Sequence, residues 1–126
     1  MRVSLGGVNA PMGLLRFLRI LALRRKQRSI LRAIDGSSVH YSDSPGISLE
    51  NPVVITGAQH DMVGTMAVFA WLIKKRGTMS VEWRLRGKSG HNDGLRHVDI
   101  YHIQTRSGVD ETFYFDVTES FGKMPF

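Results

Sequence analysis

The period of the apolar residues changes near residue 78, and this change constrains the fold more than any other feature of the chain. Residues 62–73, MVGTMAVFAWLI, are apolar nearly all round a helix, whereas apolar and polar residues alternate from residue 79 onward. The alternating segments are SVEWRLR, RHVDIYHI and TFYFDVT, and the glycine-containing stretches SGHNDG and SG separate them. Successive side chains of a strand point to opposite faces, so each segment predicts a strand with one apolar face. Together they predict a three-stranded antiparallel meander that follows a buried helix.

The helix is expected over residues 57–76, because both of its ends carry capping signals. Thr56 and Gln59 have the spacing of a T-x-x-Q capping box, and the basic run 74–76 followed by Gly77 is typical of a helix C-terminus. Before this helix, the β-branched run PVVIT at 52–56 predicts a short buried strand. The serine- and glycine-rich stretch 35–51 predicts a loop with one more short strand at SVHYS.

This order of elements predicts a two-layer α+β domain in which the central helix packs on a three- to four-stranded antiparallel sheet. By the same order it resembles the cone-shaped NTF2-like and cystatin-like folds, which carry no function by themselves. The segments NPVVITGAQHDMVGTMAVFAWL and YFDVTESFGK, with a strand tryptophan between them, also resemble a group of small bacterial proteins over most of residues 52–123. This second resemblance implies no activity.

The charge is divided unevenly along the chain. Residues 1–34 hold eight Arg or Lys and no Asp or Glu, whereas residues 35–126 hold nine basic and eleven acidic residues. We therefore divide the chain into a basic N-terminal helical arm, residues 1–34, and a single α+β domain, residues 35–126. The basic arm predicts an acidic partner, either an anionic membrane surface or an acidic protein. Its candidate contact residues are Arg16, Arg19, Arg24, Arg25, Lys26 and Arg28.

The arm should be helical over residues 11–34, PMGLLRFLRILALRRKQRSILRAI, and two half-helices are expected because the apolar stripe changes sides near RRKQR. The first half could lie in a membrane interface, or the whole helix could pack on its own domain. The first half is too short and too charged to span a bilayer, and its arginines interrupt the apolar region that a secretory signal would need. We expect a cytoplasmic protein that can be peripheral at a membrane. Nucleic-acid binding through the arm is a weaker alternative.

Polar side chains should form a row on one face of the meander. A two-residue turn at Ser107-Gly108 pairs Asp99 with Asp116, Tyr101 with Tyr114 and His97 with Thr118. A six-residue SGHNDG loop places Arg84 beside Asp99 and Arg86 beside His97. The simplest interpretation is a solvated ladder of charges. The alternative is acid–base chemistry by Asp99 or Asp116 with His97 nearby.

The other face of the meander should be apolar and should include His102. In a cone-shaped fold such a face can line a ligand pocket, whose expected residues are Trp83, His102, Phe113, Met62, Met66 and Phe69. A metal site is not expected, because a strand points His97 and Asp99 one way and His102 the other, so the ligands do not converge. No cofactor motif is present, and we expect none.

These patterns leave two main hypotheses of function. The first is a non-enzymatic binding or interaction module whose basic arm attaches it to a membrane surface or a partner. The second is a small acid–base enzyme that uses His102 or the face of His97, Asp99 and Asp116. A homodimer through an exposed sheet edge, at residues 79–87 or 109–118, is a further expectation about partners.

Overall fold

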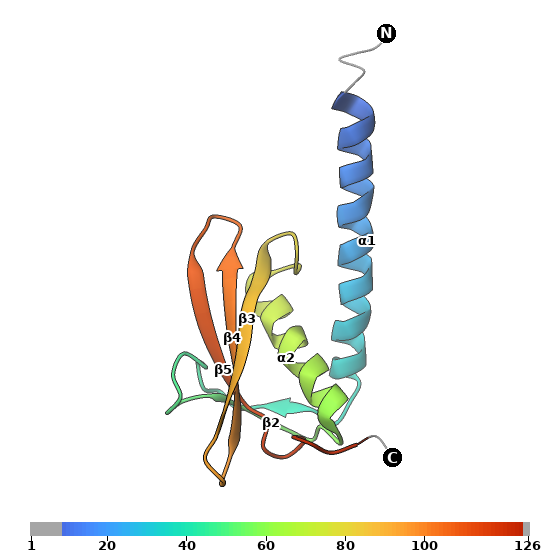
Figure 1. The fold of residues 1–126 in the computed structure, drawn as a ribbon. Coiled ribbons are helices and arrows are strands. Elements are labelled where there is room, and N and C mark those ends of the chain that lie inside the picture. Colours follow the sequence, from blue (N-terminus) through green and yellow to red (C-terminus); the bar gives the residue numbers. More distant parts are fainter. Residues whose placement is uncertain (1–8, 125–126) are drawn as a thin grey trace.

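The computed structural model describes the backbone of residues 9–124 and the side chains of residues 13–124 (Figure 1). Two helices and five strands follow one another as α1 (Asn9–Asp35), β1 (His40–Tyr41), β2 (Val53–Thr56), α2 (Asp61–Arg76), β3 (Trp83–Asn92), β4 (His97–Thr105) and β5 (Asp110–Asp116). The strands form one sheet in the order β1-β2-β5-β4-β3. The α+β class and the meander of β3, β4 and β5 are therefore confirmed.

The sheet is mixed and five-stranded, so the expectation of a purely antiparallel sheet of three or four strands is wrong. The strand β2 joins it beside β5 in the parallel direction, with Val53 opposite Phe115 and Val54 opposite Asp116. A parallel pair needs a long connection, and here α2, β3 and β4 supply it. The strand β1 then pairs antiparallel with β2 and forms one edge.

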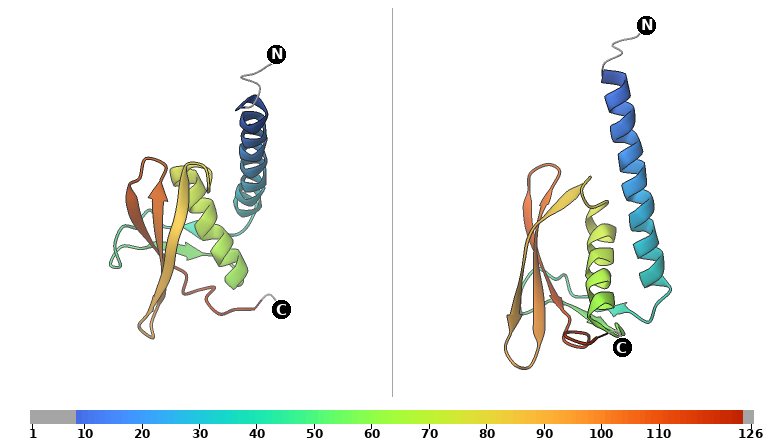
Figure 2. Two further views of the ribbon diagram at one scale, coloured as in Figure 1. Left: turned by 45° about the horizontal axis from the view of Figure 1, so that its top comes forward. Right: turned by 45° about the vertical axis from the view of Figure 1, so that its right-hand side comes forward.

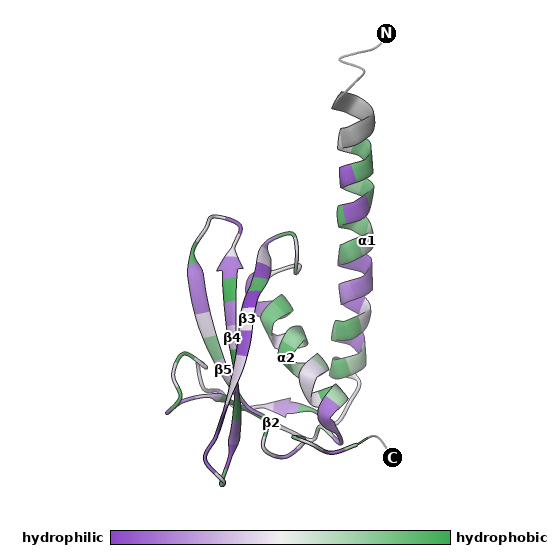
Figure 3. Ribbon diagram, viewed as in Figure 1, coloured by the Kyte–Doolittle hydropathy of each residue, from purple (hydrophilic) through white to green (hydrophobic). Residues whose placement is uncertain are grey.

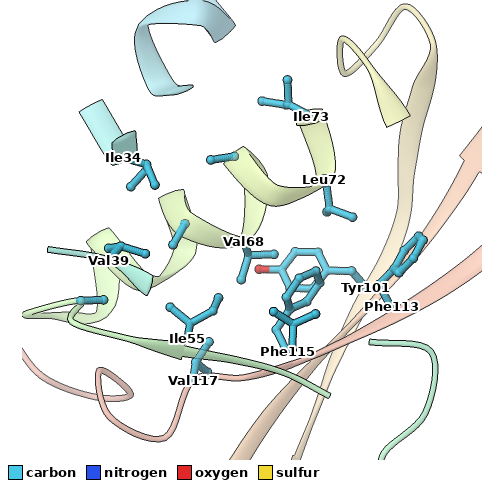
Figure 4. Packing of buried hydrophobic residues seen from close by; sticks show 14 of the residues in the cluster. Ile34, Val39, Ile55, Val68, Leu72, Ile73, Tyr101, Phe113, Phe115 and Val117 are labelled. Atoms are coloured by element: carbon cyan, nitrogen blue, oxygen red, sulfur yellow. The ribbon is translucent and has the colours of Figure 1, made fainter. Parts of the chain in front are cut away.

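The helix α2 covers one face of the sheet, and the lower half of α1 packs on the outer side of α2 (Figure 2). Aromatic side chains fill the layer between α2 and the sheet (Figure 4). Phe69 packs edge-on against Tyr101 with ring centroids 5.7 Å apart, and Trp71 packs edge-on against both Phe113 and Phe115. Such geometry adds stability beyond the burial of apolar area.

The expected capping box of α2 is absent, and the helix starts at Asp61 rather than at residue 57. Thr56 instead pairs with His40 in the β1–β2 ladder, and Gly57 turns the chain with a φ of 78°. His60 occupies the N-cap position without a side-chain cap. The C-terminus is as expected, because the Gly77 N–H donates to the Ile73 carbonyl at 2.8 Å with a φ of 100° at Gly77.

The helix α1 is continuous over 27 residues, so the two expected half-helices are one helix with two environments. Its packed side in the second half carries Gln27, Ile30, Leu31 and Ile34, the spacing of one helical face. The amide of Gln27, 5% exposed, bonds both backbone groups of Met79: its Nε2 donates to the carbonyl at 2.9 Å and its Oε1 accepts from the N–H at 2.7 Å. This pair of bonds, which we call the Gln27 clamp, fixes α1 to the α2–β3 connection.

Three residues, 106–108, rather than two lie inside the hydrogen bond that closes the β4–β5 hairpin, and this decides the register. The Thr105 N–H donates to the Val109 carbonyl at 2.8 Å, and Gly108 has a φ of 92°. A type I turn followed by such a residue is a common three-residue hairpin. Tyr101 consequently lies opposite Phe113 and Asp99 opposite Phe115. The predicted pairs Asp99–Asp116, Tyr101–Tyr114 and His97–Thr118 are therefore wrong.

One extra loop residue also reverses which side chains of β4 point toward the core and which point to the open face of the sheet. The side chains of Asp99, Tyr101 and Ile103 are buried, whereas His102 is exposed. The expectation that His102 lies on the apolar face is therefore wrong. The apolar face of β5 is as expected, since Phe113 and Phe115 are buried.

The β3–β4 hairpin differs from the expected one as well. Residues 89–92 belong to β3, and the chain turns at 93–96, where the Asp93 side chain accepts from the Leu95 and Arg96 N–H groups at 3.0 Å. Arg84 lies opposite Gln104, and a bulge follows between Leu85 and Gly87. The predicted pairs Arg84–Asp99 and Arg86–His97 are thus wrong. Of the two expected sheet edges, β3 is an edge, whereas β5 lies between β2 and β4.

Replacing Gly57 by alanine should be far more costly than replacing Gly94. Both glycines have a positive φ, of 78° and 87°, so both variants carry backbone strain. A Cβ at Gly57 would also overlap the Ser38 carbonyl oxygen, whereas nothing lies within 4 Å of a Cβ at Gly94. We expect Gly57→Ala to lose at least about 2 kcal/mol more free energy of unfolding than Gly94→Ala in urea titrations. Equal losses would contradict this packing of Gly57 on Ser38.

The Arg76–Glu111 pair should make stability depend on pH in acid. The Arg76 Nε donates to Glu111 Oε1 at 2.6 Å, and this bond with the guanidinium lowers the pKa of Glu111 below its ordinary value. Because the pKa is lower in the folded than in the unfolded protein, the pair stabilises the fold above the ordinary glutamate pKa. That contribution is lost as the pH falls through the lowered pKa.

Glu111→Gln should therefore lose about 1 kcal/mol of unfolding free energy at pH 7 and less at pH 3, in urea titrations at both values. Glu50→Gln is the control, since Glu50 is exposed and has no ion pair within residues 13–124. A loss of the same size at both pH values would mean that the charge of Glu111 does not stabilise the fold.

Candidate functional site

The structure brings His97 and Asp99 together with Lys88 on the side of the sheet that faces α2. His97 Nε2 lies 3.0 Å from Asp99 Oδ1, and Lys88 Nζ lies 3.7 Å from Asp99 Oδ2. His97 and Asp99 are two residues apart on β4 and so share a face, as the sequence predicts. Lys88 reaches the same face because the bulge in β3 brings it opposite Tyr101. Asp99 is only 8% exposed, so its carboxylate depends on these two partners.

An aromatic ring and a second carboxylate complete the surroundings. The Phe121 ring stacks on the His97 imidazole, with centroids 3.6 Å apart and an interplanar angle of 11°. Asp61, the first residue of α2, joins them around an open hollow of about 290 Å³. We call Asp61, Lys88, His97, Asp99 and Phe121 the His97 cluster.

Tyr101 lies beside this cluster, inside the core. It is fully buried, and Lys88 Nζ sits 5.4 Å from the centre of its ring. Burial, followed by the negative charges of Asp99 and Asp61, raises the pKa of the Tyr101 phenol far above its ordinary value. Tyr101 is therefore a neutral phenol at any physiological pH, and its ring forms the floor under Lys88.

Chemically, the cluster holds an imidazole in a defined orientation. Asp99 engages Nε2 of His97, and the Asn92 amide lies 3.4 Å from Nδ1. A carboxylate that orients an imidazole is a component of acid–base sites, but here both ring nitrogens already have neighbours. Within residues 13–124, no group of three or more His, Asp or Glu side chains is arranged to hold a metal ion.

The other expected acid–base residues lie elsewhere. Asp116 lies opposite Val98, and its Oδ1 accepts from the Thr118 N–H at 3.0 Å and from the Thr118 hydroxyl. His102 lies on the open face of the sheet, where Nδ1 is 3.0 Å from the Thr112 hydroxyl. Neither residue contributes to the His97 cluster.

The six residues expected to line a ligand pocket do not surround one space. Trp83 is buried, and its indole N–H donates to the Gly77 carbonyl at 2.7 Å. Phe113 is buried against Trp71, whereas Met62 is 60% exposed and His102 is on the opposite face. Met66 and Phe69 pack against the core as partly buried side chains.

A second candidate site is the first half of α1, which extends beyond the rest of the molecule (Figure 1). Leu14, Phe17, Leu18 and Leu21 form one stripe there and are between 41% and 57% exposed. We call residues 14–21 the arm tip. Its residues are apolar except for Arg16 and Arg19, and apolar colour dominates this part of the helix (Figure 3). None of the described helices is long and apolar enough to cross a membrane.

Sequence reasoning missed Lys88 and Phe121, and it did not place Asp61 near His97. The positions of Lys88 and Asp61 depend on a bulge and on a helix start that no local pattern indicates. Phe121 follows β5 in the turn 117–123, where the Phe121 N–H donates to the Val117 carbonyl at 2.9 Å. An aromatic residue next to a glycine in a turn is a weak signal, and only the contact with His97 gives it meaning.

The neutral form of His97 should carry its proton on Nε2. Ionised Asp99 can only accept a hydrogen bond, and the Asn92 amide can donate to Nδ1. Nitrogen-15 shifts of the imidazole at a pH where it is neutral should therefore show the Nε2–H tautomer. Asp99→Ala should move His97 toward a mixture of tautomers.

His102 serves as the control in the same spectra, because the Thr112 hydroxyl can donate or accept and selects no tautomer. A dominant Nδ1–H form of His97 in the unaltered protein would contradict the arrangement of the His97 cluster.

Comparison with known proteins returned no match to a family model, to a curated protein or to a solved structure. The resemblance of residues 52–123 to small bacterial proteins therefore stays an expectation, as does the likeness to cone-shaped folds. Any inference of function has to come from the side chains of this chain.

Proposed function

We propose that this protein is a non-enzymatic binding module that attaches to an anionic membrane surface through the arm tip. The observation that carries the proposal is the exposed apolar stripe of Leu14, Phe17, Leu18 and Leu21 on a helix that projects past its own domain. Monomeric soluble proteins seldom leave such a stripe uncovered. Amphipathic helices with an apolar stripe and arginines are typical of peripheral membrane attachment.

The charge of α1 favours a membrane over a second copy of the chain. On a helical wheel, Arg25, Arg28 and Arg32 continue the face that the apolar stripe of the arm tip begins. All three arginines are exposed, and no acidic residue lies between residues 13 and 34. A parallel partner helix of the same sequence would place arginines against arginines along this face, and an antiparallel one would place them against the apolar stripe. An anionic lipid surface instead accepts the apolar side chains and attracts the arginines.

The packed half of α1 supports the same proposal mechanically. Ile34 is 4% exposed in the core, and the Gln27 clamp binds the helix to Met79. Arg24 adds an ion pair with Glu82 at 3.2 Å. A tip that is continuous with a clamped helix would hold the α+β domain at the surface in a fixed attitude rather than on a flexible tether.

Acid–base catalysis by His97 and Asp99 is the second candidate function. Their 3.0 Å contact beside an open hollow is the observation in its favour. It ranks lower because both nitrogens of His97 have neighbours and no serine, threonine or lysine side chain of the described residues hydrogen-bonds to the ring.

Vesicle co-sedimentation tests the proposed attachment. The full chain should bind vesicles of phosphatidylcholine with phosphatidylglycerol more tightly than vesicles of phosphatidylcholine alone. Replacing Leu14, Phe17, Leu18 and Leu21 together by serine should weaken binding to the anionic vesicles by about 100-fold or more, because each side chain no longer leaves water. Added salt should weaken the binding of the unaltered chain.

The matched control replaces by serine four apolar residues of the domain that are even more exposed: Ile47, Met62, Leu95 and Met124. This variant should bind as the unaltered chain does. If both variants bind equally, the arm tip is not the anchor. Binding of nucleic acid that survives in the serine variant of the arm tip, without any binding to vesicles, would favour the nucleic-acid alternative. Substitution is a cleaner test than removing residues 1–34, which would delete Ile34 from the core.

A further inference from the structure

One end of the α+β domain points the same way as the arm tip. The β4–β5 loop and the connection between α2 and β3 lie at this end in every view, and the β3–β4 turn lies at the other (Figures 1 and 2). We call the first end, with residues 78–86 and 104–109, the arm-side end. A surface that takes up the arm tip end-on, with α1 steep to it, would therefore have this end of the domain facing it.

Two arginines of the arm-side end are held together without a carboxylate partner. The Arg84 Nη2 donates to Gln104 Oε1 at 2.8 Å, and the Arg86 Nη1 donates to the same oxygen at 3.3 Å. The shared acceptor is a neutral amide, so both guanidinium charges stay uncompensated. Among residues 13–124, neither arginine has a carboxylate within 4.0 Å. Like charges brought this close favour an anion that can accept from both.

A shallow hollow of about 420 Å³ adjoins this pair, between the start of β3 and the β4–β5 loop. Arg84, Gln104 and Arg106 line it, together with Gly108. The nearby acids are largely engaged: Glu82 binds Arg24 and the Thr78 N–H, and Glu111 binds Arg76. Asp110, opposite Gln104, is the one exposed acid beside them in the described chain, so the local charge stays positive.

The opposite end of the domain has a different balance of acidic and basic side chains. Asp93 lies in the β3–β4 turn and pairs with Arg96 at 3.8 Å, and Glu119 follows β5 and accepts from the Gly57 N–H. Asp61 and the buried Asp99 belong to the His97 cluster, where Lys88 pairs with Asp99 at 3.7 Å. An anionic surface is thus attracted to the arm-side end and gains little at the other.

We infer that Arg84, Arg86 and Arg106 form a second membrane contact, which binds the phosphate groups of anionic lipid head groups while the arm tip inserts. This inference rests on the proposed function and adds to it an orientation and a lipid-binding site. The exposed Val109, in the same end, would approach the interface together with the arginines. The sheet would then stand upright on the membrane, with the His97 cluster directed away from it.

The double variant Arg84→Gln/Arg106→Gln should lower the association constant with phosphatidylglycerol-containing vesicles by about 25-fold, about five-fold for each arginine. The matched control, Arg96→Gln/Lys123→Gln, removes the same charge from the other end. It should lower the constant by less than about two-fold at 0.15 M salt, where charges beyond about 8 Å are screened. Equal losses in the two variants would overturn the inference, since only net charge would then matter.

The absence of cysteine allows a second measurement on the orientation. A polarity-sensitive fluorophore on Ser107→Cys, in the β4–β5 loop, should shift to the blue when anionic vesicles are added. The same label on Leu95→Cys, in the β3–β4 turn, should not shift. A shift at Leu95 that equals or exceeds the one at Ser107 would contradict the upright orientation.

Competition with inorganic phosphate distinguishes a lipid head group from free phosphate as the group that the hollow binds. At matched ionic strength phosphate should not displace the protein from vesicles, and displacement would assign the hollow to free phosphate instead. Failure of the unaltered chain to bind anionic vesicles would remove the proposed function and this inference together. Binding that needs the arm tip but not Arg84 and Arg106 would remove this inference alone.

Discussion

The register between β4 and β5 is the constraint on which the rest of this structure depends. A three-residue loop, closed by the Thr105–Val109 hydrogen bond, sets Tyr101 opposite Phe113. Tyr101 thereby enters the core under α2, and Asp99 and His97 come to the same side of the sheet. A loop shorter by one residue would expose this face of β4 and bury His102 instead. The His97 cluster, the aromatic layer and the packing of α2 all follow from that single choice.

The Gln27 clamp determines how α1 is divided. Below Gln27 the helix packs with Ile30, Leu31 and Ile34 on the domain, and above it the side chains are mostly exposed. A buried amide that bonds both backbone groups of Met79 satisfies its own donor and acceptor, so it costs little to bury and fixes the position of the helix. The arm tip continues a helix that is held at its base.

The molecule consequently has two chemically different ends. One end presents the exposed apolar side chains of the arm tip, and beside them the arginines of the arm-side end, which have no carboxylate partner among residues 13–124. The His97 cluster lies toward the opposite end, where a buried carboxylate, a lysine and an oriented imidazole satisfy one another. Such a closed network stabilises one arrangement of the sheet without requiring any ligand.

Local patterns in the sequence determined the α+β class, the C-terminus of α2, the apolar face of β5 and the basic character of the arm. These features depend on periodicity, composition and glycine placement within one segment. Only the tertiary structure decided the face of β4, because Val98 and Ile100 on one side compete with Tyr101 and Ile103 on the other, and the alternation alone does not choose. The parallel pairing of β2 with β5 and the approach of Lys88 and Phe121 to His97 likewise join segments far apart in the chain. Loop length, a β-bulge and the packing of whole elements set these contacts, and none of them leaves a signal in the residues concerned.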